Sequence, residues 1–186
     1  MKKIPTIFKR NPDNMRELLN EHHPDCDWVF NGEGVATRKY DGTCCLIRDG
    51  KLYKRREVKG GKSIPDNFEE VNYDEVTKKR VGWVPVSEDE PGDVWHIKAL
   101  SEMLEKDKLH NQTYELLGPK IQSNAESVAA YFLLPHSHAE TCNDCPRTFD
   151  QIKEWLVDKN IEGIVFHHPD GRMGKIKKKD FGMKRI

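Results

Sequence analysis

From Val35 onward, the alternation of apolar and polar residues is typical of β-strands with one buried face. Two such runs within residues 43–55 flank Asp49 and Gly50, a pair that favours a tight two-residue turn, so the sequence predicts a β-hairpin here. Further strands are predicted at residues 113–118 and 131–136, and on both sides of a turn at residues 169–171.

Apolar residues follow a helical spacing in fewer places. The clearest helix lies within residues 148–160, where the apolar side chains share one face and Thr148 with Gln151 has the pattern of a capping box. A second helix is predicted after Trp95. A short third helix is predicted at residues 14–21.

The order of these elements predicts the fold class and the domain organisation. Residues 59–93 are rich in glycine, proline and charge, and they predict a long irregular connection with one short strand at residues 83–86. Strands with helices interspersed in irregular order indicate an α+β fold built on antiparallel sheets. The length predicts a single domain over residues 1–186, with an N-terminal extension (1–34, including the short helix) and a core (35–180).

Composition narrows the class of protein. Apolar residues make up 36% of the chain and charged residues 33%, which is polar, but aromatic and β-branched residues are too frequent for a disordered chain. No apolar run reaches the length of a membrane span, and the N-terminus has Pro5 and charges where a signal peptide needs an apolar core. Five cysteines, an odd number, fit a reducing compartment. We therefore expect a cytoplasmic protein without a membrane partner.

Charge is unevenly distributed along the chain, although the net charge is zero. Residues 48–62 and 172–185 are basic, whereas residues 66–75 and 88–93 are acidic. The two basic segments could meet around one anionic ligand, or they could form unrelated solvated faces.

The last predicted hairpin groups polar side chains. If Ile164 lies opposite Lys175, then Glu162 lies opposite Lys177, and Glu162, Lys175 and Lys177 share one face of the sheet. A carboxylate suits Mg²⁺, two ammonium groups suit phosphate oxygens, and Gly163 lets another group approach the backbone. An exposed hairpin with cross-strand ion pairs would explain the same residues.

Four short motifs occur in a fixed order and resemble those of the covalent nucleotidyltransferases, the superfamily of polynucleotide ligases and RNA capping enzymes. They are KYDG at 39–42, YELLG at 114–118, EGIV at 162–165 and KIK at 175–177. Longer strings, among them ATRKYDGTCC, KLYKR, GWVPV and IEGIVFH, resemble the vertebrate 5′-to-3′ RNA ligase family.

This resemblance implies an antiparallel-sheet nucleotidyltransferase (adenylyltransferase) domain of the ligase and capping-enzyme type. It also implies an ATP-dependent RNA ligase that requires Mg²⁺ or Mn²⁺. Such an enzyme forms a lysyl-AMP intermediate, transfers AMP to an RNA 5′-phosphate, and lets a 3′-OH displace AMP to seal the strand. Its partner would be RNA with 5′-phosphate and 3′-OH ends.

The resemblance also implies roles for individual residues. Lys39 would be the nucleophile, and an amine is suited to the role because its P–N bond stays reactive enough to pass AMP onward. Asp41 would help to position Mg²⁺ or hold the lysine. Arg55 would contact the ribose or a phosphate, and Glu115 would address the ribose or the metal environment.

The remaining roles fall on the last hairpin. Glu162 would bind in the Mg²⁺ shell, while Lys175 and Lys177 would hold the α-phosphate and stabilise charge during displacement. Several nearby cations would also favour a neutral, nucleophilic Lys39, because like charges disfavour its protonated form.

Two departures from the superfamily pattern bear on the alternatives. Cys44 stands where many DNA ligases and capping enzymes have an arginine, which argues against a DNA ligase and against a GTP-using capping enzyme. The chain ends at Ile186, so we expect no C-terminal OB domain, and an accessory protein for binding RNA would then be needed by an otherwise monomeric enzyme. A non-catalytic nucleic-acid-binding module remains the alternative from another class.

One further cluster stays open. His136, His138, Cys142 and Cys145 lie close together in sequence with a spacing that suits tetrahedral Zn²⁺. A zinc knuckle would support the non-catalytic alternative, whereas the absence of bound zinc would leave the residues as ordinary loop side chains.

Overall fold

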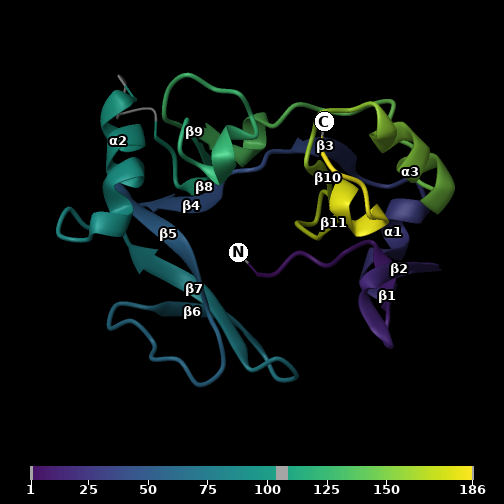
Figure 1. Cartoon of the computed structure of the whole chain (residues 1–186), viewed down its shortest axis with the longest axis horizontal. Helices are drawn as coiled ribbons and strands as arrows, with labels where there is room; N and C mark the ends of the chain where they lie inside the picture. Colours follow the sequence, from purple (N-terminus) through teal and green to yellow (C-terminus); the bar gives the residue numbers. More distant parts are fainter. Residues whose placement is uncertain (1, 104–108, 186) are drawn as a thin grey trace. The chain divides into compact units, whose positions relative to one another are not determined.

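The computed structural model describes residues 2–103 and 109–185 (Figure 1). It has an α+β fold with antiparallel sheets, which confirms the predicted class. The chain divides into two compact units. We call the unit that includes Asp41–His138 the central unit, and the unit formed by Ile4–Tyr40 and the residues from 139 onward the terminal unit. The single domain expected over residues 1–186 stays a prediction.

The elements alternate irregularly between strands and short helices. The strands are β1 (Phe8–Asn11), β2 (Asn14–His22), β3 (Val35–Lys39), β4 (Thr43–Arg48), β5 (Lys51–Val58), β6 (Glu69–Asp74), β7 (Lys79–Pro85), β8 (Gln112–Leu117), β9 (Phe132–Pro135), β10 (Gly163–His167) and β11 (Met173–Lys177). The helices are α1 (Asp27–Phe30), α2 (Val94–Glu102) and α3 (Phe149–Val157). Short 3₁₀ turns lie at Pro24–Cys26, Pro91–Asp93, Gln122–Asn124, His136–His138 and Lys178–Phe181.

The central unit is built on one six-stranded sheet with the order β6-β7-β5-β4-β8-β9. All neighbouring strands pair antiparallel. One face of this sheet packs into a core in which Cys45, Tyr114 and Leu133 are buried together with Ala99 of α2. The helix predicted after Trp95 is therefore confirmed, and its burial of Ala99 is what fixes it on the sheet.

The hairpin of β4 and β5 is confirmed at the predicted turn. Arg48 pairs with Lys51, and the two residues between them, Asp49 and Gly50, have φ angles of 52° and 72°. Positive φ at both positions is the geometry that matches the right-handed twist of the flanking strands. The local sequence signal was therefore sufficient here.

The prediction for residues 59–93 is wrong in part. Instead of one short strand, this region contains the antiparallel pair β6 and β7. Its charged residues are compatible with strands because they pair across the sheet: Arg80 with Glu70 on β6, and Lys79 with Glu57 on β5 at 3.1 Å. A strand at the solvated edge of a sheet tolerates such charges.

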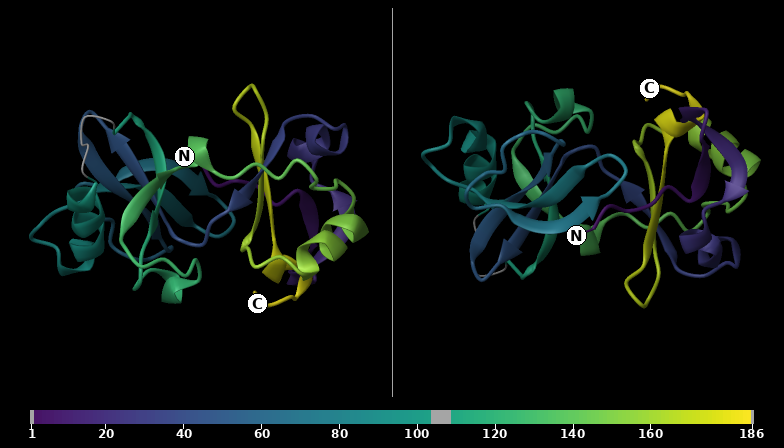
Figure 2. Two further views of the ribbon diagram at one scale, coloured as in Figure 1. Left: turned by 90° about the horizontal axis from the view of Figure 1, so that it is seen from above. Right: turned by 90° about the horizontal axis from the view of Figure 1, so that it is seen from below.

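The terminal unit has a three-stranded sheet with the order β11-β10-β3 and a separate hairpin of β1 and β2 (Figure 2). Its core combines Ile164, Phe166 and Ile176 from the sheet with Ile152 and Leu156 from α3, all fully buried. Strand alternation places these sheet residues on one face, which leaves the opposite face for polar side chains.

The helix predicted at residues 14–21 is wrong, because this segment forms β2. The Pro-Asp pair after Asn11 makes a hairpin turn, in which the side chain of Asn11 accepts a hydrogen bond from the backbone N–H of Asp13 at 3.0 Å. Leu18 then packs into the core of the terminal unit. The turn and the pairing with β1 override the weak helical pattern.

Helix α3 is confirmed, but its predicted capping box is not formed. Thr148 is the N-cap residue, but its hydroxyl accepts no backbone N–H and instead donates to the side-chain oxygen of Gln151 at 2.9 Å. At the other end, the buried ammonium of Lys178 donates to the carbonyls of Val157 at 2.9 Å and Lys159 at 2.8 Å. The C-terminal end of the helix therefore has the stronger cap.

A segment near the N-terminus extends the three-stranded sheet. Ile7 donates its backbone N–H to the carbonyl of Lys175 at 3.0 Å, and Lys175 donates to the carbonyl of Pro5 at 2.9 Å. Thr6 and Lys175 thus form a parallel bridge beside β11. Across both described ranges, no helix combines the length and the apolarity needed to cross a membrane.

Candidate functional site

The polar face of the three-stranded sheet carries a row of lysines. Gly163 on β10 lies opposite Lys39 on β3 and opposite Lys177 on β11. In the next row along the same face, Val165 lies opposite Lys175. Alternation along the strands therefore puts Lys39, Lys175 and Lys177 on one side of the sheet, away from the apolar core.

Glu162 joins two of these lysines. It immediately precedes β10, and its Oε2 accepts from the Nζ of Lys39 at 2.5 Å while its Oε1 accepts from the Nζ of Lys177. The side chains of Lys39, Lys177 and Glu162 are 20%, 19% and 11% exposed. All three charges are therefore largely shielded from water, which strengthens their interaction.

The two ammonium groups decide the ionisation of Glu162. Burial by itself would raise the pKa of this carboxyl, but the charges of Lys39 and Lys177 and their hydrogen bonds outweigh burial and lower it. Glu162 is thus an anion at neutral pH. Together with Lys175, the group has three ammonium ions and one carboxylate, so it suits an anionic ligand such as a phosphate.

The predicted register of the last hairpin is wrong by one residue. Lys177 pairs with Gly163 and Lys175 with Val165, each one position beyond the predicted partner, because the connecting loop is one residue longer than the predicted turn. Such a shift normally moves a side chain to the other face. The contact of Glu162 with Lys177 forms nevertheless, because Glu162 lies just before the strand, where alternation no longer fixes its direction.

Gly163 has a structural reason to be glycine. A Cβ atom at this position would lie 2.1 Å from the carbonyl oxygen of Ile176 and 2.7 Å from the Cα of Lys177. The group that approaches this backbone is therefore the neighbouring strand itself. Any larger residue would push β11 away and with it the ammonium of Lys177.

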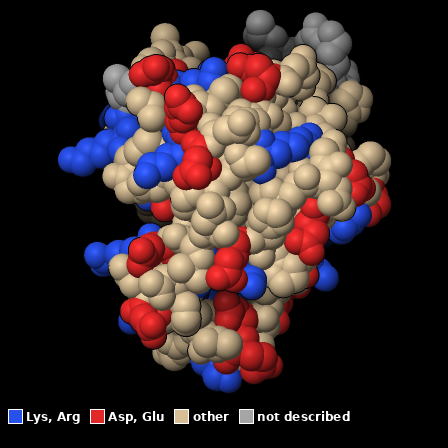
Figure 3. Space-filling view, turned by 90° about the vertical axis from the view of Figure 1, so that its right-hand side faces the viewer, with Lys and Arg blue, Asp and Glu red and all other residues tan. Residues whose placement is uncertain are grey.

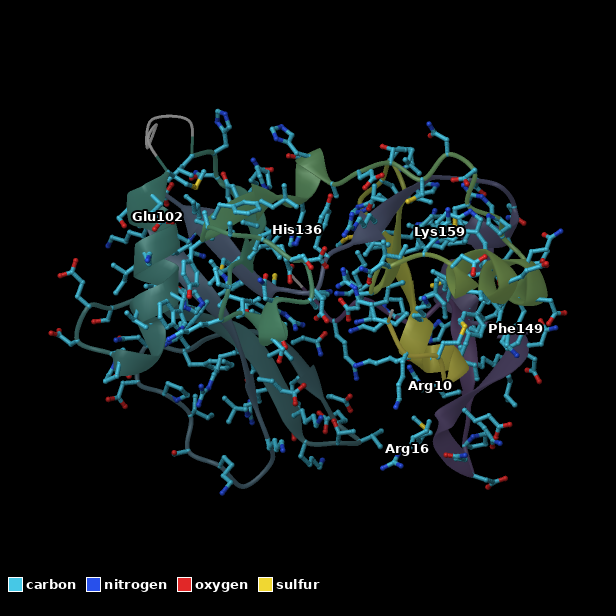
Figure 4. The ribbon with its side chains drawn as sticks, turned by 45° about the horizontal axis from the view of Figure 1, so that its top comes forward. Arg10, Arg16, Glu102, His136, Phe149 and Lys159 are labelled. Carbon is cyan, nitrogen blue, oxygen red and sulfur yellow. The ribbon has the colours of Figure 1, made fainter. Side chains whose placement is uncertain are left out.

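Asp180 supports the row and was not predicted. Its buried carboxylate accepts from the backbone N–H of Lys177 at 3.0 Å and from Arg10 at 2.6 Å. Figure 4 labels Arg10 beside the C-terminal 3₁₀ turn. An aspartate three residues after Lys177 is the spacing of a capping box, so this signal was present in the sequence.

A second polar group lies in the central unit around Glu115. This largely buried carboxylate accepts from the backbone N–H of Gly42 at 3.1 Å through Oε1, and its Oε2 lies 2.9 Å from the Nε2 of His136. The other ring nitrogen of His136, which is labelled in Figure 4, lies 2.8 Å from the hydroxyl of Thr113. Glu115 thus ties β8, the end of β9 and the Asp41-Gly42 turn together.

The turn is tightly packed. A Cβ on Gly42 would lie 2.4 Å from the carbonyl oxygen of Leu116, so only glycine fits. The backbone N–H of Asp41 donates to Glu126 at 2.8 Å, a contact that the sequence did not suggest. Two carboxylates therefore fix the backbone of the turn that follows Lys39 in sequence.

Arg55 lies on β5 opposite Trp83. Lys54 pairs with Cys45 on the core side of the sheet, so alternation puts Arg55 on the opposite face, the one that also carries Glu115. The buried Nε of Arg55 has no hydrogen-bond partner in the described part of the chain. A buried donor of this kind favours a ligand that brings an acceptor.

The predicted site residues thus belong to two groups. The terminal unit assembles Lys39, Glu162 and Lys177, with Lys175 in the adjacent row. The central unit contains Asp41, Arg55 and Glu115. The roles that the family resemblance implies for these residues stay predictions.

The zinc alternative gains no support. Within residues 2–103 and 109–185, no three His, Cys, Asp or Glu side chains are arranged to hold a metal ion. His136 contacts Glu115 and Thr113 instead. Burial raises the pKa of Cys142, and it raises that of Cys145 to about 12.

Comparison with known proteins gives a consistent result. A family model described as RNA ligase 1 matches residues 100–185, a range that includes Glu115 and the β10–β11 hairpin. RNA ligase 1 of Mus musculus is 24% identical over 98% of this chain and 80% of its own length. RNA ligase 1 of Rattus norvegicus is 23% identical over 98% of this chain and 81% of its own length. RNA ligase 1 of Danio rerio is 24% identical over 81% of this chain and 68% of its own length.

The chain therefore resembles RNA ligase 1, which confirms the resemblance seen in the motifs. The alignment with the Mus musculus protein extends over 272 positions, more than the 186 residues of the chain. The relative thus contains segments that have no counterpart here.

Proposed function

We propose that this chain is an ATP-dependent RNA ligase with a nucleotidyltransferase fold, which joins RNA 5′-phosphate and 3′-OH ends through a lysyl-AMP intermediate. The observation that carries the proposal is the contact of Lys39 and Lys177 with one shielded carboxylate, Glu162, in a chain that resembles RNA ligase 1. This group combines a nucleophile with the charges that a phosphate requires.

The proposed reaction has three balanced steps. The neutral amine of Lys39 attacks the α-phosphorus of ATP; a P–N bond forms, the bond to the bridging oxygen breaks, and pyrophosphate leaves while the amine releases a proton to solvent. An oxygen of the RNA 5′-phosphate then attacks the same phosphorus, and the P–N bond breaks as the lysine regains a proton. Finally the 3′-OH attacks the activated 5′-phosphate, loses its proton, and AMP leaves.

The ion pair with Glu162 has to change before the first step. A carboxylate at hydrogen-bond distance favours the charged form of Lys39, which is not nucleophilic. We infer that Lys39 leaves this ion pair when ATP binds: Lys175 and Lys177 would turn to the phosphates, and Glu162 would hold the metal that accompanies the nucleotide instead of the lysine. Glu162 would thus hold the lysine charged at rest and free it when substrate arrives.

The residues suit a metal that arrives with the nucleotide. Mg²⁺ is commonly bound by one or two carboxylates together with substrate phosphates and water, and Mn²⁺ accepts the same oxygen ligands. Glu162 supplies one such carboxylate, and Asp41 is the second candidate from the resemblance. When bound, the metal would counter the charge that develops on the phosphates.

Two residues of the central unit have roles in the proposed reaction. Arg55 would donate its unpartnered Nε to the ribose or to a phosphate. Glu115 would position the turn that follows Lys39 and would address the ribose or the metal environment. The alternatives, a DNA ligase or a GTP-using capping-type enzyme, differ from this proposal in the nucleotide or the nucleic acid that they use.

Intact-mass measurement tests the chemistry directly. The purified chain incubated with ATP and Mg²⁺ should gain the mass of AMP, GTP should give no adduct, and Lys39→Arg should give none with either nucleotide. The adenylated protein should then seal RNA ends and leave the corresponding DNA ends unjoined. A GMP adduct, or an adduct that persists in Lys39→Arg, would refute the proposal.

The cellular setting completes the proposal. We infer a cytoplasmic monomer that uses an accessory protein to hold its RNA. Size-exclusion chromatography with light scattering, run with and without an RNA oligonucleotide, would test the monomer. A stable dimer in both runs would be inconsistent with it.

A further inference from the structure

A basic pocket lies at one end of the six-stranded sheet of the central unit. It has a volume of about 320 Å³ and lies where the β5–β6 connection meets the turn between β6 and β7. The strands β6 and β7 are drawn in the lower part of Figure 1. The lining residues are Val58, Lys59, Gly60, Gly61, Lys62, Ile64, Tyr73, Lys78 and Arg80. All of them precede residue 100, so the pocket lies outside the range matched by the RNA ligase 1 family model.

The charges of the lining all have one sign. Four basic side chains contribute to it and no carboxylate does. Lys78 reaches an outside carboxylate, Glu75, at 3.3 Å, but both groups are well exposed, so this pair is weak. By contrast, acidic and basic side chains are interspersed on the face that Figure 3 shows.

Lys59 and Lys62 are the available cations. The structure gives neither side chain a hydrogen bond or an ion pair with any described residue. Lys62 donates its backbone N–H to the carbonyl of Lys59 at 3.1 Å, so a turn holds the two residues together. Two ammonium groups that line one pocket, with no carboxylate partner among the described residues, favour an anion that spans both.

The two turns that border the pocket pack closely against each other. A Cβ on Gly60 would lie 2.9 Å from the Cβ of Lys78, so the two turns approach each other through this glycine. Gly61 and Lys78 have φ angles of +78° and +53°, a conformation that costs free energy at a lysine. The strained backbone is held in place by the packing of the two turns.

An aromatic ring completes the lining. The guanidinium of Arg80 lies over the ring of Tyr73, with 4.4 Å from its Cζ to the ring centroid. Arg80 also contacts Glu70, so its plane is fixed on two sides. A planar cation on an aromatic ring is a surface on which nucleobases stack, and single-stranded RNA is bound in this way.

We propose that this pocket binds a nucleotide of a single-stranded RNA segment, with its phosphate at Lys59 and Lys62 and its base against Tyr73 and Arg80. The inference rests on the proposed function, because an RNA ligase has to hold the strand beyond the ends that react. Inorganic phosphate shares the anionic chemistry but makes no use of the ring. The pairing of cations with an aromatic surface therefore favours RNA.

Fluorescence anisotropy of a short labelled oligoribonucleotide, without ATP or metal, tests the pocket. The double variant Lys59→Gln with Lys62→Gln should bind about tenfold more weakly than the unmodified chain. The slope of log K against log salt should become shallower by about 0.7 for each lost phosphate contact. Tyr73→Leu should weaken binding about fivefold, the lower end expected for lost stacking, and leave the salt slope unchanged.

Matched variants control for charge and folding. Lys51→Gln with Lys153→Gln removes the same charge from two exposed positions outside the lining, and this variant should bind like the unmodified chain. Thermal unfolding of every variant should give unchanged midpoints. Unweakened binding in the Lys59 and Lys62 variant, or an equal loss in the control pair, would overturn the proposal.

Two further measurements distinguish RNA binding in this pocket from binding of a small anion and from the proposed ligase activity. Inorganic phosphate, compared with chloride at equal ionic strength, should not displace the RNA; displacement at low millimolar phosphate would make this a small-anion site and contradict the proposal. Self-adenylation is measured on the same samples. Normal adenylation with pocket-independent RNA binding would defeat the pocket alone, whereas pocket-dependent binding without any adenylation would defeat the proposed ligase and leave the pocket.

Discussion

Two carboxylates of the candidate site, Glu162 and Glu115, differ in their partners. Glu162 in the terminal unit is bound by the ammonium groups of two lysines, both at the ends of flexible side chains. Glu115 in the central unit is bound by the backbone N–H of Gly42 and by the ring of His136. The first carboxylate balances charge, whereas the second fixes backbone position.

This difference indicates how each group responds to a ligand. Lysine side chains can turn from a carboxylate to a phosphate without moving the backbone, so the Glu162 group can rearrange when an anion binds. The contact of Glu115 with Gly42 cannot be exchanged without opening the turn. We therefore expect substitutions of Glu162 to act mainly on chemistry, and those of Glu115 mainly on positioning.

Lys39→Arg should have the largest effect. Arginine keeps a positive charge beside Glu162, so the free energy of unfolding should change by less than about 1 kcal/mol, but arginine stays protonated and cannot attack phosphorus. Intact mass after incubation with ATP and Mg²⁺ should show no adduct. A normal adenylated fraction would mean that Glu162 holds a spectator lysine.

Glu162→Gln should have the next largest effect. The amide cannot neutralise Lys39 and Lys177, so the free energy of unfolding should fall by about 2 kcal/mol, since both ammonium groups are largely shielded. Adenylation should fall by about 100-fold, the scale for losing one preorganised electrostatic group. Rates from quenched-flow mass measurement and urea unfolding give the two values.

The exposed carboxylate of Glu154 on α3 provides the matched control. Glu154→Gln removes the same charge and should leave both the adenylation rate and the free energy of unfolding unchanged. Equal losses in the two variants would show that net charge, and not the lysine pair, is responsible.

Two substitutions of Glu115 distinguish the effect of its charge from the effect of its hydrogen bonds. Glu115→Gln keeps an oxygen for Gly42 and an N–H for His136, so adenylation should stay within about twofold of normal. Glu115→Ala loses both contacts, which should lower the free energy of unfolding by about 1.5 kcal/mol and adenylation by about tenfold. A severe loss in Glu115→Gln would show that the charge itself acts, as expected of a metal or ribose contact.

The smallest expected effect is a change with pH in the stability difference between the unmodified chain and Glu162→Gln. Its pKa in the folded chain is lowered from 4.5, so the unfolded chain binds the proton more readily. The stabilisation from this group is present above that pH and is lost as pH falls through the lowered pKa. Urea unfolding should therefore show the gap between the unmodified chain and Glu162→Gln narrowing below about pH 4.5. A constant gap would contradict this.

Local signals in the sequence predicted the elements that local geometry decides. Asp49 and Gly50 determine their own turn, and the apolar face of α3 could be counted directly. Residues 14–21 were mispredicted because a hairpin partner, β1, decides their conformation. The strands β6 and β7 were missed in part because their charges pair across strands, which a linear pattern does not reveal.

The candidate site was predictable to a similar degree. The motifs placed Lys39, Glu162 and Lys177 in one group, and the structure brings these side chains into contact. The exact register could not be predicted, because one residue in a loop changes it. The contact of His136 with Glu115 and that of Asp180 with Arg10 depend on tertiary packing, so no direct signal for them was present in the sequence.

The sheet that carries the lysine row is assembled from distant parts of the chain. Residues 5–7, β3 and the β10–β11 hairpin all contribute to it, whereas the six strands of the central unit follow one another in sequence. During synthesis on the ribosome, the central sheet can therefore form while the chain is still growing, but the lysine row cannot close until residue 177 has emerged. We expect a nascent chain to acquire its nucleophile's surroundings last, so a stalled or truncated product would be folded in part and yet inert.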